Sequence, residues 1–369
     1  MKVLITGGHF SPAYSLIKEL ESRGHKIAVV GRRFVFEGDT SESLEYKICK
    51  EENIHFFELK TGRFQRKFTP STIPSLLRVV GGFKNAKRIL EEFKPDVVLT
   101  FGGYIAPPVA LAAKFQKIPV VLHEQTQQAG LSGKFVARFA KYVCVSFRES
   151  KRYFPGKKVV FTGLPLRSDI FDIKKKIDLP KGKLLYITGG SSGSHFINVK
   201  IREIIDDLVE KYVVIHQTGE NGFSDFENSV AKRETLPETL QKKYVVRKFI
   251  NPDEIGFVLN DSDLILSRAG ANTILEFFAL SRVSLLIPLE SGQSGEQLAN
   301  ASLVKKIGVG DYMTESQAES IKLLKKINNM FEDLSDYRQN MGNARSYIVP
   351  NAASKIADIV GEACGKTIS

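Results

Sequence analysis

The chain has 369 residues, of which 43% are hydrophobic and 25% charged, and it carries a formal net charge of +12. This composition provides enough apolar side chains for about two domain cores, and it excludes a small disulfide-stapled scaffold, a collagen-like chain and a disordered chain. Residues 1–160 hold the whole excess, with 27 lysines and arginines against 14 acidic residues, which leaves 26 against 27 for residues 161–369. A basic half of this kind serves solubility or attracts an anionic partner such as nucleic acid or acidic lipid.

Apolar runs and cysteines indicate the compartment. No run approaches the roughly 18 to 20 apolar residues of a membrane-spanning helix, and the first apolar stretch is too short for the core of a signal peptide. The three cysteines, Cys49, Cys144 and Cys364, are odd in number and form no CxxC pair, so neither a disulfide framework nor a zinc site is expected. We therefore expect a cytoplasmic protein.

Short apolar runs alternate with helix-period segments along the whole chain. In the first half, strands are predicted at residues 2–6, 27–31, 97–101, 120–123 and 142–146. In the second half they are predicted at residues 184–188, 213–218, 244–248, 264–267 and 285–288, with helices such as 198–211 and 273–280 between them. Strand–helix alternation predicts an α/β fold with parallel, doubly wound sheets.

Two sets of strands are too many for one open sheet, so we expect two domains. Glycine and proline interrupt the periodicity at residues 163–167, which places the break there. The predicted domains are residues 1–162 and 163–345, followed by a C-terminal segment, residues 346–369, whose helix is predicted at 350–361.

The first glycine turn, Gly7-Gly8, directly follows the first predicted strand. Ligands of doubly wound sheets bind beyond the carboxyl ends of the strands, so this turn is a candidate site, although it lacks the GxGxxG spacing of a dinucleotide fingerprint. His9 comes next and is the first candidate for a general base, because its side chain titrates near neutral pH. Glu124, beside His123 at another strand end, is the second candidate, and a purely structural role stays open for a lone histidine.

Residues 61–90 contain lysines and arginines but no acidic residue, interleaved with apolar side chains. Such a segment either binds to the surface of an anionic bilayer or forms an amphipathic helix that packs on the core and exposes its basic face to solvent. Gly81-Gly82 is expected to break that helix. Nucleic acid is not expected as a partner, because no recognised nucleic-acid motif accompanies the charge.

The second glycine turn, residues 188–194, begins at Thr188 and places three glycines and three serines between a strand and a helix. This composition favours a diphosphate bound by backbone amides, and no lysine follows Gly193 as it would in a Walker A loop.

A third turn, residues 267–271, precedes a helix carrying Glu276. The carboxylate of Glu276 is either an acceptor for two ribose hydroxyls or an ordinary carboxylate on the surface of the helix. Asp261 and Asp263 form a DxD motif, which holds a divalent ion in metal-dependent sugar transferases. Here the motif precedes a strand and not the carboxyl end of one, so a capping role for these residues is favoured and no metal is expected.

Taken together, these motifs resemble the MurG family of UDP-N-acetylglucosamine transferases, glycosyltransferase family 28. The resemblance covers nearly the whole chain and lies in strings at residues 102–104, 121–125, 129–131, 163–167, 189–193, 216–219, 267–276 and 297–300. It implies a GT-B fold, in which two Rossmann-like domains face a cleft and the C-terminal helix crosses back to the first domain.

The resemblance also implies which residues carry the two sites. The donor site would include Arg167, Gly190, Ser191, Ser192, Gly193, Arg268, Ala271, Glu276, Gln297 and Asn300. The acceptor side would include Gly7, Gly8, Tyr104, His123, Gln125 and Thr126, with His9 and Glu124 as the catalytic candidates. Residues 61–90 correspond to the membrane-association surface.

The implied activity is inverting transfer of N-acetylglucosamine from its UDP donor to lipid I, giving lipid II for peptidoglycan, without cofactor or metal. The implied partners are UDP-N-acetylglucosamine, a polyprenyl-diphosphate-linked sugar acceptor and the anionic inner face of the plasma membrane, where the protein would be peripheral. Because the first glycine turn is shorter than in the family, two alternatives stay open. One is a GT-B transferase for another lipid-linked or glycolipid acceptor, and the other is a membrane-docked protein that binds a UDP-sugar with little catalysis.

Overall fold

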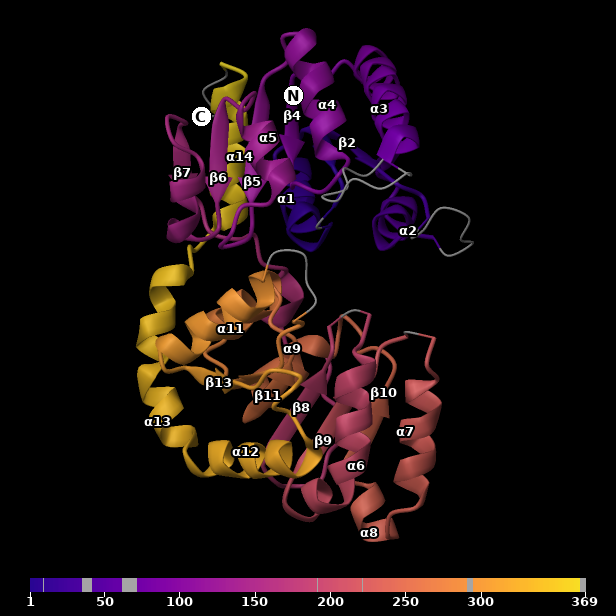
Figure 1. Cartoon of the computed structure of the whole chain (residues 1–369), viewed down its shortest axis with the longest axis vertical. Coiled ribbons are helices and arrows are strands. Elements are labelled where there is room, and N and C mark those ends of the chain that lie inside the picture. The colour runs from indigo at the N-terminus through magenta and orange to yellow at the C-terminus, as the bar shows by residue number, and fades with distance from the viewer. Residues whose placement is uncertain are drawn as a thin grey trace. The chain divides into compact units, whose positions relative to one another are not determined.

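The computed structural model describes residues 1–8, 10–34, 42–61, 72–190, 192–220, 222–290 and 295–365, and of these residues 72–80 by their backbone only. The chain divides into two compact units (Figure 1). Unit 1 comprises Met1–Arg167 and Val349–Ser369, and unit 2 comprises Ser168–Ile348. The chain therefore leaves unit 1 once and returns to it with its last segment.

Unit 1 is built on a seven-stranded parallel sheet in the order β3-β2-β1-β4-β5-β6-β7. The strands are β1 (Lys2–Thr6), β2 (Lys26–Gly31), β3 (His55–Glu58), β4 (Val97–Thr100), β5 (Val120–Glu124), β6 (Tyr142–Val145) and β7 (Val159–Phe161). The helices are α1 (Phe10–Ser22), α2 (Leu44–Glu51), α3 (Thr72–Phe93), α4 (Ala106–Phe115), α5 (Leu131–Ala137), the 3₁₀ helix η1 (Arg148–Tyr153) and α14 (Ala352–Ala363). The five strands predicted for this half are confirmed, whereas the edge strands β3 and β7 were not predicted.

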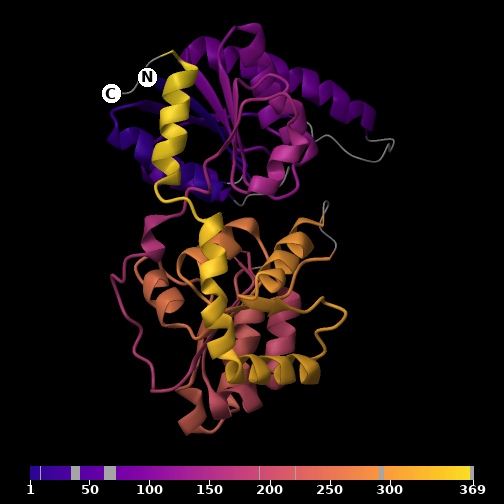
Figure 2. The ribbon, with the colours of Figure 1, turned by 90° about the vertical axis from the view of Figure 1, so that its left-hand side faces the viewer.

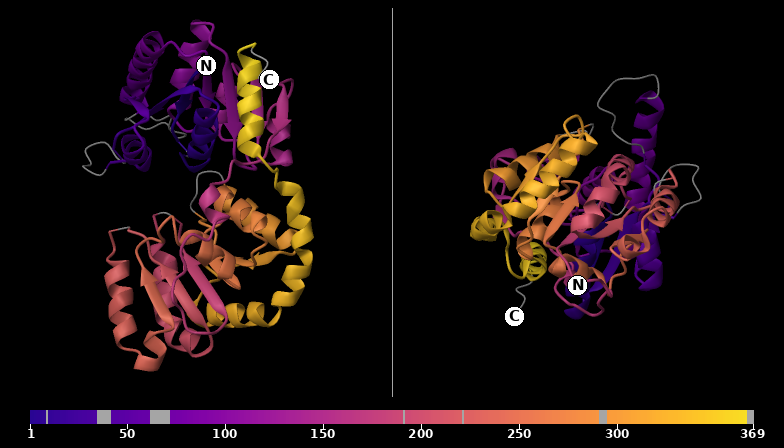
Figure 3. Two further views of the ribbon diagram at one scale, coloured as in Figure 1. Left: turned by 180° about the vertical axis from the view of Figure 1, so that it is seen from behind. Right: turned by 90° about the horizontal axis from the view of Figure 1, so that it is seen from below.

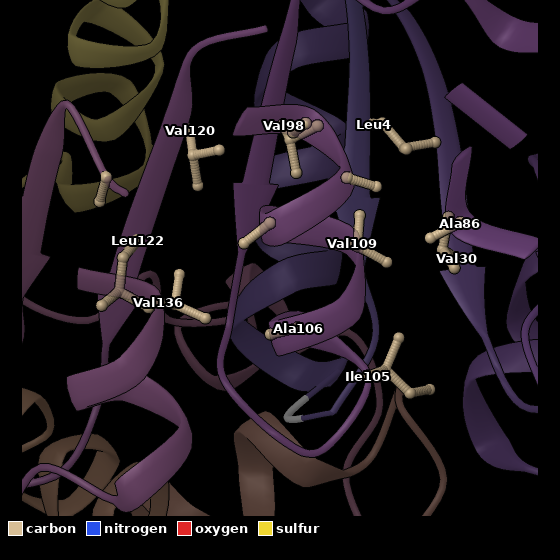
Figure 4. Packing of buried hydrophobic residues seen from close by; sticks show 14 of the residues in the cluster. Leu4, Val30, Ala86, Val98, Ile105, Ala106, Val109, Val120, Leu122 and Val136 are labelled. Atoms are coloured by element: carbon tan, nitrogen blue, oxygen red, sulfur yellow. The ribbon is translucent and has the colours of Figure 1, made fainter. Parts of the chain in front are cut away.

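Side-chain alternation along the strands of unit 1 separates two cores. Val3 and Ile5 of β1 join the core beneath α1, α2 and α14, whereas Leu4 joins the core beneath α3, α4 and α5. Figure 4 shows the second core, with Leu4 and Val109 among its members. Because both faces of the sheet are covered, its strands are apolar at nearly every position.

The C-terminal helix α14 packs on unit 1 beside α1, as Figures 2 and 3 show from two directions. Ile356 and Val360 lie one turn apart on its buried face and are fully buried. Burial of each such side chain is worth about 1.5 to 3 kcal/mol, which fixes the returning segment to unit 1.

Helix α3 runs without a break through Gly81-Gly82, so the expectation that these glycines end it is wrong. A Cβ on Gly82 would stand 2.2 Å from Oγ1 of Thr61. The glycine thus lets the helix pass close to the Thr61 side chain, at a cost of roughly 1 kcal/mol in helix propensity.

Unit 2 is built on a six-stranded parallel sheet in the order β10-β9-β8-β11-β12-β13. The strands are β8 (Leu184–Thr188), β9 (Val213–Gln217), β10 (Tyr244–Arg247), β11 (Leu264–Ser267), β12 (Ser284–Leu286) and β13 (Gly310–Tyr312). The helices are α6 (His195–Lys211), α7 (Asp225–Glu234), α8 (Glu238–Gln241), α9 (Ile255–Asp261), α10 (Ala271–Ala279), α11 (Glu296–Lys306), α12 (Ser320–Glu332) and α13 (Leu334–Gln339), with the 3₁₀ helices η2 (Ser168–Ile170) and η3 (Asn340–Tyr347). The five predicted strands are again present, and the short edge strand β13 was not predicted.

The strand order reverses direction once in each sheet. In unit 1 the reversal lies between β1 and β4, and in unit 2 it lies between β8 and β11. Ligands of doubly wound sheets bind at the carboxyl ends of the strands at such a switch point. The first glycine turn lies at the switch point of unit 1, and the second and third turns lie at that of unit 2.

Among the helices of the described residues, none combines the length and apolar character needed to cross a bilayer.

Candidate functional site

The turn after β8 is the central feature of the candidate site in unit 2. Gly190 and Gly193 have φ angles of +86° and +73°, which a glycine adopts without strain. The Gly193 amide donates to the Gly190 carbonyl at 3.1 Å, and the Gly190 amide donates to Oγ1 of Thr188 at 3.1 Å. The amides of these two glycines therefore both donate hydrogen bonds within the turn.

The loop after β9 presses against this turn. A Cβ on Gly193 would stand 1.9 Å from the Thr218 carbonyl oxygen, and one on Gly219 would stand 2.3 Å from the Gly193 nitrogen. The two backbones touch where the glycines face each other. This contact, rather than the turn conformation alone, requires glycine at both positions.

Helix α6 begins immediately after the turn. Ser194 is its N-cap, with Oγ accepting from the Ile197 amide at 3.4 Å. The remaining amides of the first helical turn have no partner within the helix, and with the helix dipole they form a favourable place for an anion. Of the predicted diphosphate residues, Ser192 is exposed at this point, and Ser191 lies outside the described residues.

Arg268 connects the turns of β8 and β11 across the switch point. Its guanidinium donates to Oγ of Ser194 at 2.7 Å, to the Ile287 carbonyl at 3.0 Å and to Glu315 at 2.6 Å. Arg268 therefore holds the N-cap of α6, and its charge is paired with a carboxylate. Ala271, the other predicted residue of this turn, is the buried first residue of α10 after the N-cap Gly270.

Three of the remaining donor-side candidates belong to helices of unit 2, and the fourth, Arg167, belongs to unit 1. Glu276 is nearly buried on α10, about a turn and a half after the β11 turn. Asn300 is fully buried and donates to the Ala269 carbonyl at 2.9 Å, which fastens the β11 turn to α11. Gln297 accepts from the Leu289 amide at 2.9 Å. Arg167 is half-buried and is the last residue of the first segment of unit 1.

In unit 1 the turns after β1 and β4 touch through glycines in the same way. A Cβ on Gly8 would stand 3.1 Å from the Gly102 carbonyl oxygen, and one on Gly103 would stand 3.3 Å from Cα of Gly8. Tyr104 follows, half-buried, with the Arg32 guanidinium 5.6 Å from the centre of its ring. His9, the candidate base, lies outside the described residues.

Glu45 is a carboxylate at this edge that the sequence analysis missed. It lies in the first turn of α2, accepts from the Arg32 amide at 3.2 Å and fills the space beside Gly7, where a Cβ would stand 3.1 Å from its carboxyl carbon. Burial raises the pKa of Glu45, against the lowering effect of the Arg32 amide and charge. An acidic residue in the first turn of a helix is the only sequence signal it carries, and its contact with Gly7 depends on the tertiary fold.

Four predicted acceptor-side residues follow one another at the end of β5 and are all buried. His123 lies 3.1 Å from the Gly163 carbonyl and 3.3 Å from Oγ of Ser146. The carboxylate of Glu124 accepts from Oγ1 of Thr126 at 2.7 Å and from its amide at 3.2 Å. Gln125 donates to the Phe101 carbonyl at 3.4 Å. The structure thus brings them together, and their described contacts fix the loop after β5.

Asp263 and Ser262 of the DxD segment have structural partners. Asp263 accepts from the Leu184 amide at 2.9 Å and from Arg338 at 2.8 Å, and Ser262 donates to the Val258 carbonyl at 2.5 Å at the end of α9. They precede β11, so they lie at the opposite end of that strand from Arg268.

Residues 6–145 match the glycosyltransferase family 28 N-terminal domain, and residues 184–360 match the glycosyltransferase family 28 C-terminal domain. The chain is 32% identical over 370 residues, covering 97% of this chain and 98% of the relative, to a Clostridium botulinum protein named UDP-N-acetylglucosamine--N-acetylmuramyl-(pentapeptide) pyrophosphoryl-undecaprenol N-acetylglucosamine transferase. It is also 32% identical over 374 residues, with 97% and 98% coverage, to the protein of that name from Clostridium novyi.

Solved structures share the fold over the whole chain. Acinetobacter baumannii MurG aligns with a TM-score of 0.74 and 25% identity, covering 98% of this chain and 99% of that one. The calicheamicin glycosyltransferase CalG4 aligns with a TM-score of 0.70 and 16% identity, covering 100% and 99%. Together with the two parallel sheets and the C-terminal helix, these similarities confirm the α/β, GT-B fold that the resemblance implied.

Proposed function

This chain belongs to glycosyltransferase family 28, and we therefore propose that it transfers N-acetylglucosamine from UDP-N-acetylglucosamine to lipid I, giving lipid II. The reaction proposed is inverting, with the C4 hydroxyl of the muramyl sugar as the attacking group. The observation that carries the proposal is the pair of turns joined by Arg268 at the switch point of unit 2, in a chain that matches transferases of this name over 97% of its length.

The donor diphosphate would lie at the start of α6. Ser192 is exposed there, and the first-turn amides and the helix dipole favour negative charge, which grows on the diphosphate as UDP leaves. Because Arg268 is paired with Glu315 and bonded to Ser194, its proposed part is to hold the cap of α6 in place. Preorganised donors of this kind can each lower the barrier by about 3 kcal/mol.

The nucleoside end of the donor would reach α10, where the carboxylate of Glu276 is proposed to accept the two ribose hydroxyls. Glu276→Ala is expected to weaken UDP binding by about 1 to 3 kcal/mol, because the hydroxyls lose their buried acceptor. Isothermal titration with UDP measures the change. Asp311→Ala serves as the control, since Asp311 is a carboxylate of similar burial in unit 2 that lies on β13 and pairs with Lys305 and Lys326. Unchanged affinity in Glu276→Ala, with the variant folded, would remove Glu276 from the site.

The acceptor would bind at the carboxyl edge of unit 1, where Gly7, Gly8, Tyr104 and the end of β5 lie. Of the two base candidates, Glu124 has one carboxylate oxygen held by Thr126, and its other oxygen lies 2.4 Å from the place a Cβ on Gly133 would take. A carboxylate enclosed in this way has little room for a sugar hydroxyl. These contacts favour His9 as the base and Glu124 as a support of the β5 loop.

We also propose that unit 1 docks on an anionic membrane through the region around the end of α4. Phe115 is 73% exposed there and makes an edge-to-face pair with Phe83 of α3, with ring centres 5.7 Å apart. The lysines at positions 84, 114 and 117 are exposed beside these rings. An apolar side chain surrounded by lysines suits an anionic bilayer, with about 1 kcal/mol of attraction for each lysine near the surface.

Sedimentation with vesicles tests this docking. Replacing Lys84, Lys114 and Lys117 with glutamine is expected to weaken binding to vesicles containing phosphatidylglycerol roughly a hundredfold, as three lysine contacts are lost. The matched control makes the same change of charge on unit 2, at Lys181, Lys242 and Lys322. A wild-type protein that ignores anionic vesicles at low salt, or a control that loses as much binding, would contradict the docking surface.

A further inference from the structure

Two buried tyrosine hydroxyls lie beneath the turn after β8. Tyr186 is in the middle of β8 and is 3% exposed, and Tyr244 begins β10 and is fully buried. A hydroxyl buried among apolar strands costs free energy unless it is hydrogen-bonded. Each of these hydroxyls begins a chain of hydrogen bonds that ends on the turn region.

The first chain is short. The Tyr186 hydroxyl lies 2.8 Å from Oε1 of Gln217, and Nε2 of Gln217 donates to the Gly190 carbonyl at 3.3 Å. Since the amide nitrogen of Gln217 faces a carbonyl, its oxygen must face the tyrosine, and the hydroxyl is the donor. Tyr186 therefore orients the side chain that holds Gly190.

The second chain begins at Tyr244 and passes through a histidine. The Tyr244 hydroxyl lies 2.8 Å from Nδ1 of His216, Nε2 of His216 lies 2.9 Å from Oδ1 of Asn198, and Nδ2 of Asn198 donates to the Thr218 carbonyl at 2.9 Å. That same Nδ2 also donates to the carboxylate of Asp225 at 2.9 Å. The Thr218 carbonyl and the Asp225 carboxylate are both acceptors, so the atom of Asn198 that faces them is its amide nitrogen. The amide oxygen of Asn198 must therefore accept from His216.

This arrangement defines the tautomer of His216. Nε2 carries the proton, so a neutral ring accepts at Nδ1, and the Tyr244 hydroxyl donates there. Burial lowers the pKa of His216 to about 3, so the ring is neutral near pH 7 and the direction of the chain is fixed. Every hydrogen bond from Tyr244 to Thr218 then points the same way.

The Thr218 carbonyl is the group against which Gly193 packs. The two chains therefore reach the β8 turn at both of its ends, one on the Gly190 carbonyl and the other through Thr218 on Gly193. Asp225, which is buried and paired with Arg202 at 2.8 Å, anchors Asn198 from the side.

We propose that Tyr186 and Tyr244 are positioning residues for the donor, which set the orientation of the diphosphate-binding turn through these two hydrogen-bond chains. The proposal rests on the proposed donor site at the start of α6. Both hydroxyls are buried and bonded to protein side chains, so the proposed role of the two tyrosines is indirect. Their loss should leave the site present but less well aligned, which weakens binding of the diphosphate more than it weakens the fold.

Three tyrosine-to-phenylalanine variants in unit 2 test this, each lacking a single hydroxyl. Tyr186→Phe and Tyr244→Phe remove the first donor of each chain. Tyr212→Phe is the matched control, because Tyr212 is also buried, lies at the far end of α6 and bonds Asn328 at 2.9 Å. We expect the Kd for UDP to rise roughly three- to tenfold in each of the first two variants, as for the loss of one buried hydrogen bond, and to stay within about twofold in the control.

Calorimetry with UDP and thermal melts of all three variants supply the readouts, together with initial rates at varied donor. The KM for the donor should rise in Tyr186→Phe and Tyr244→Phe with little change in kcat, at melting temperatures close to that of the control. If Tyr186→Phe and Tyr244→Phe both bind UDP with wild-type affinity, the positioning role is overturned and the proposed donor site is not. An equal loss of UDP affinity in Tyr212→Phe also overturns the positioning role. Failure of the wild-type protein to bind UDP overturns the proposed function and this inference together.

Discussion

Gly193→Ala is expected to lower the affinity for UDP about a hundredfold or more, which corresponds to ~2.7 kcal/mol. The added methyl group would stand 1.9 Å from the Thr218 carbonyl, so one of the two backbones has to move. The φ angle of +73° adds a further cost of about 1 to 2 kcal/mol for any residue with a Cβ. Titration of UDP into the folded variant measures the loss.

Gly222→Ala is the control for that experiment. Gly222 lies in the loop after β9 with a φ angle of +78°, and a Cβ there would meet no atom within 4 Å. This variant therefore carries the conformational cost without the clash. If Gly193→Ala bound UDP as well as Gly222→Ala, the β8 turn would not be part of the donor site.

His9→Ala is expected to lower the turnover of N-acetylglucosamine transfer about a hundredfold while leaving the affinity for UDP unchanged, because a general base contributes to the chemical step and not to donor binding. Initial rates at saturating donor and acceptor, with a UDP titration beside them, measure both quantities. A fully active His9→Ala would eliminate this residue as the base.

Glu124→Gln separates the two base candidates. Glutamine retains an oxygen that accepts from Thr126, so the β5 loop should keep its bonds and the turnover should stay within about fivefold of wild type. Loss of turnover in Glu124→Gln beside an active His9→Ala would reverse the assignment.

Much of the fold could be predicted from the sequence, because ten of the thirteen strands in the described residues are apolar runs, and nine of these ten lie inside a parallel sheet. The three that were missed, β3, β7 and β13, all lie at sheet edges. β7 is apolar but only three residues long, and all three are half-buried, whereas β13 is the short segment Gly-Asp-Tyr, so neither shows the longer buried apolar run that marks a central strand. The fourth edge strand, β10, was predicted because it begins with the apolar run Tyr-Val-Val, whereas the other three owe more to pairing with a neighbour, which a local pattern does not reveal.

The glycines of the site could be predicted from the sequence, but their partners could not. Gly190 and Gly193 stand out as a glycine turn after a strand. The contact between Gly193 and Thr218 and the bond from Arg268 to Ser194 join segments far apart in the chain. The same holds for the contact of Gly82 with Thr61, in a helix that was expected to break at this glycine, and for the contact of Glu45 with Gly7. Such contacts follow from the packing of the whole unit.

We propose that this chain transfers N-acetylglucosamine from its UDP donor to lipid I. The most direct test incubates the protein with radiolabelled UDP-N-acetylglucosamine and a panel of polyprenyl-diphosphate sugars and glycolipids, and follows label in the lipid fraction and release of UDP. We predict label on lipid I, with UDP formed in equal amount. Transfer to a different acceptor only, or donor binding without transfer to any lipid, would contradict the claim.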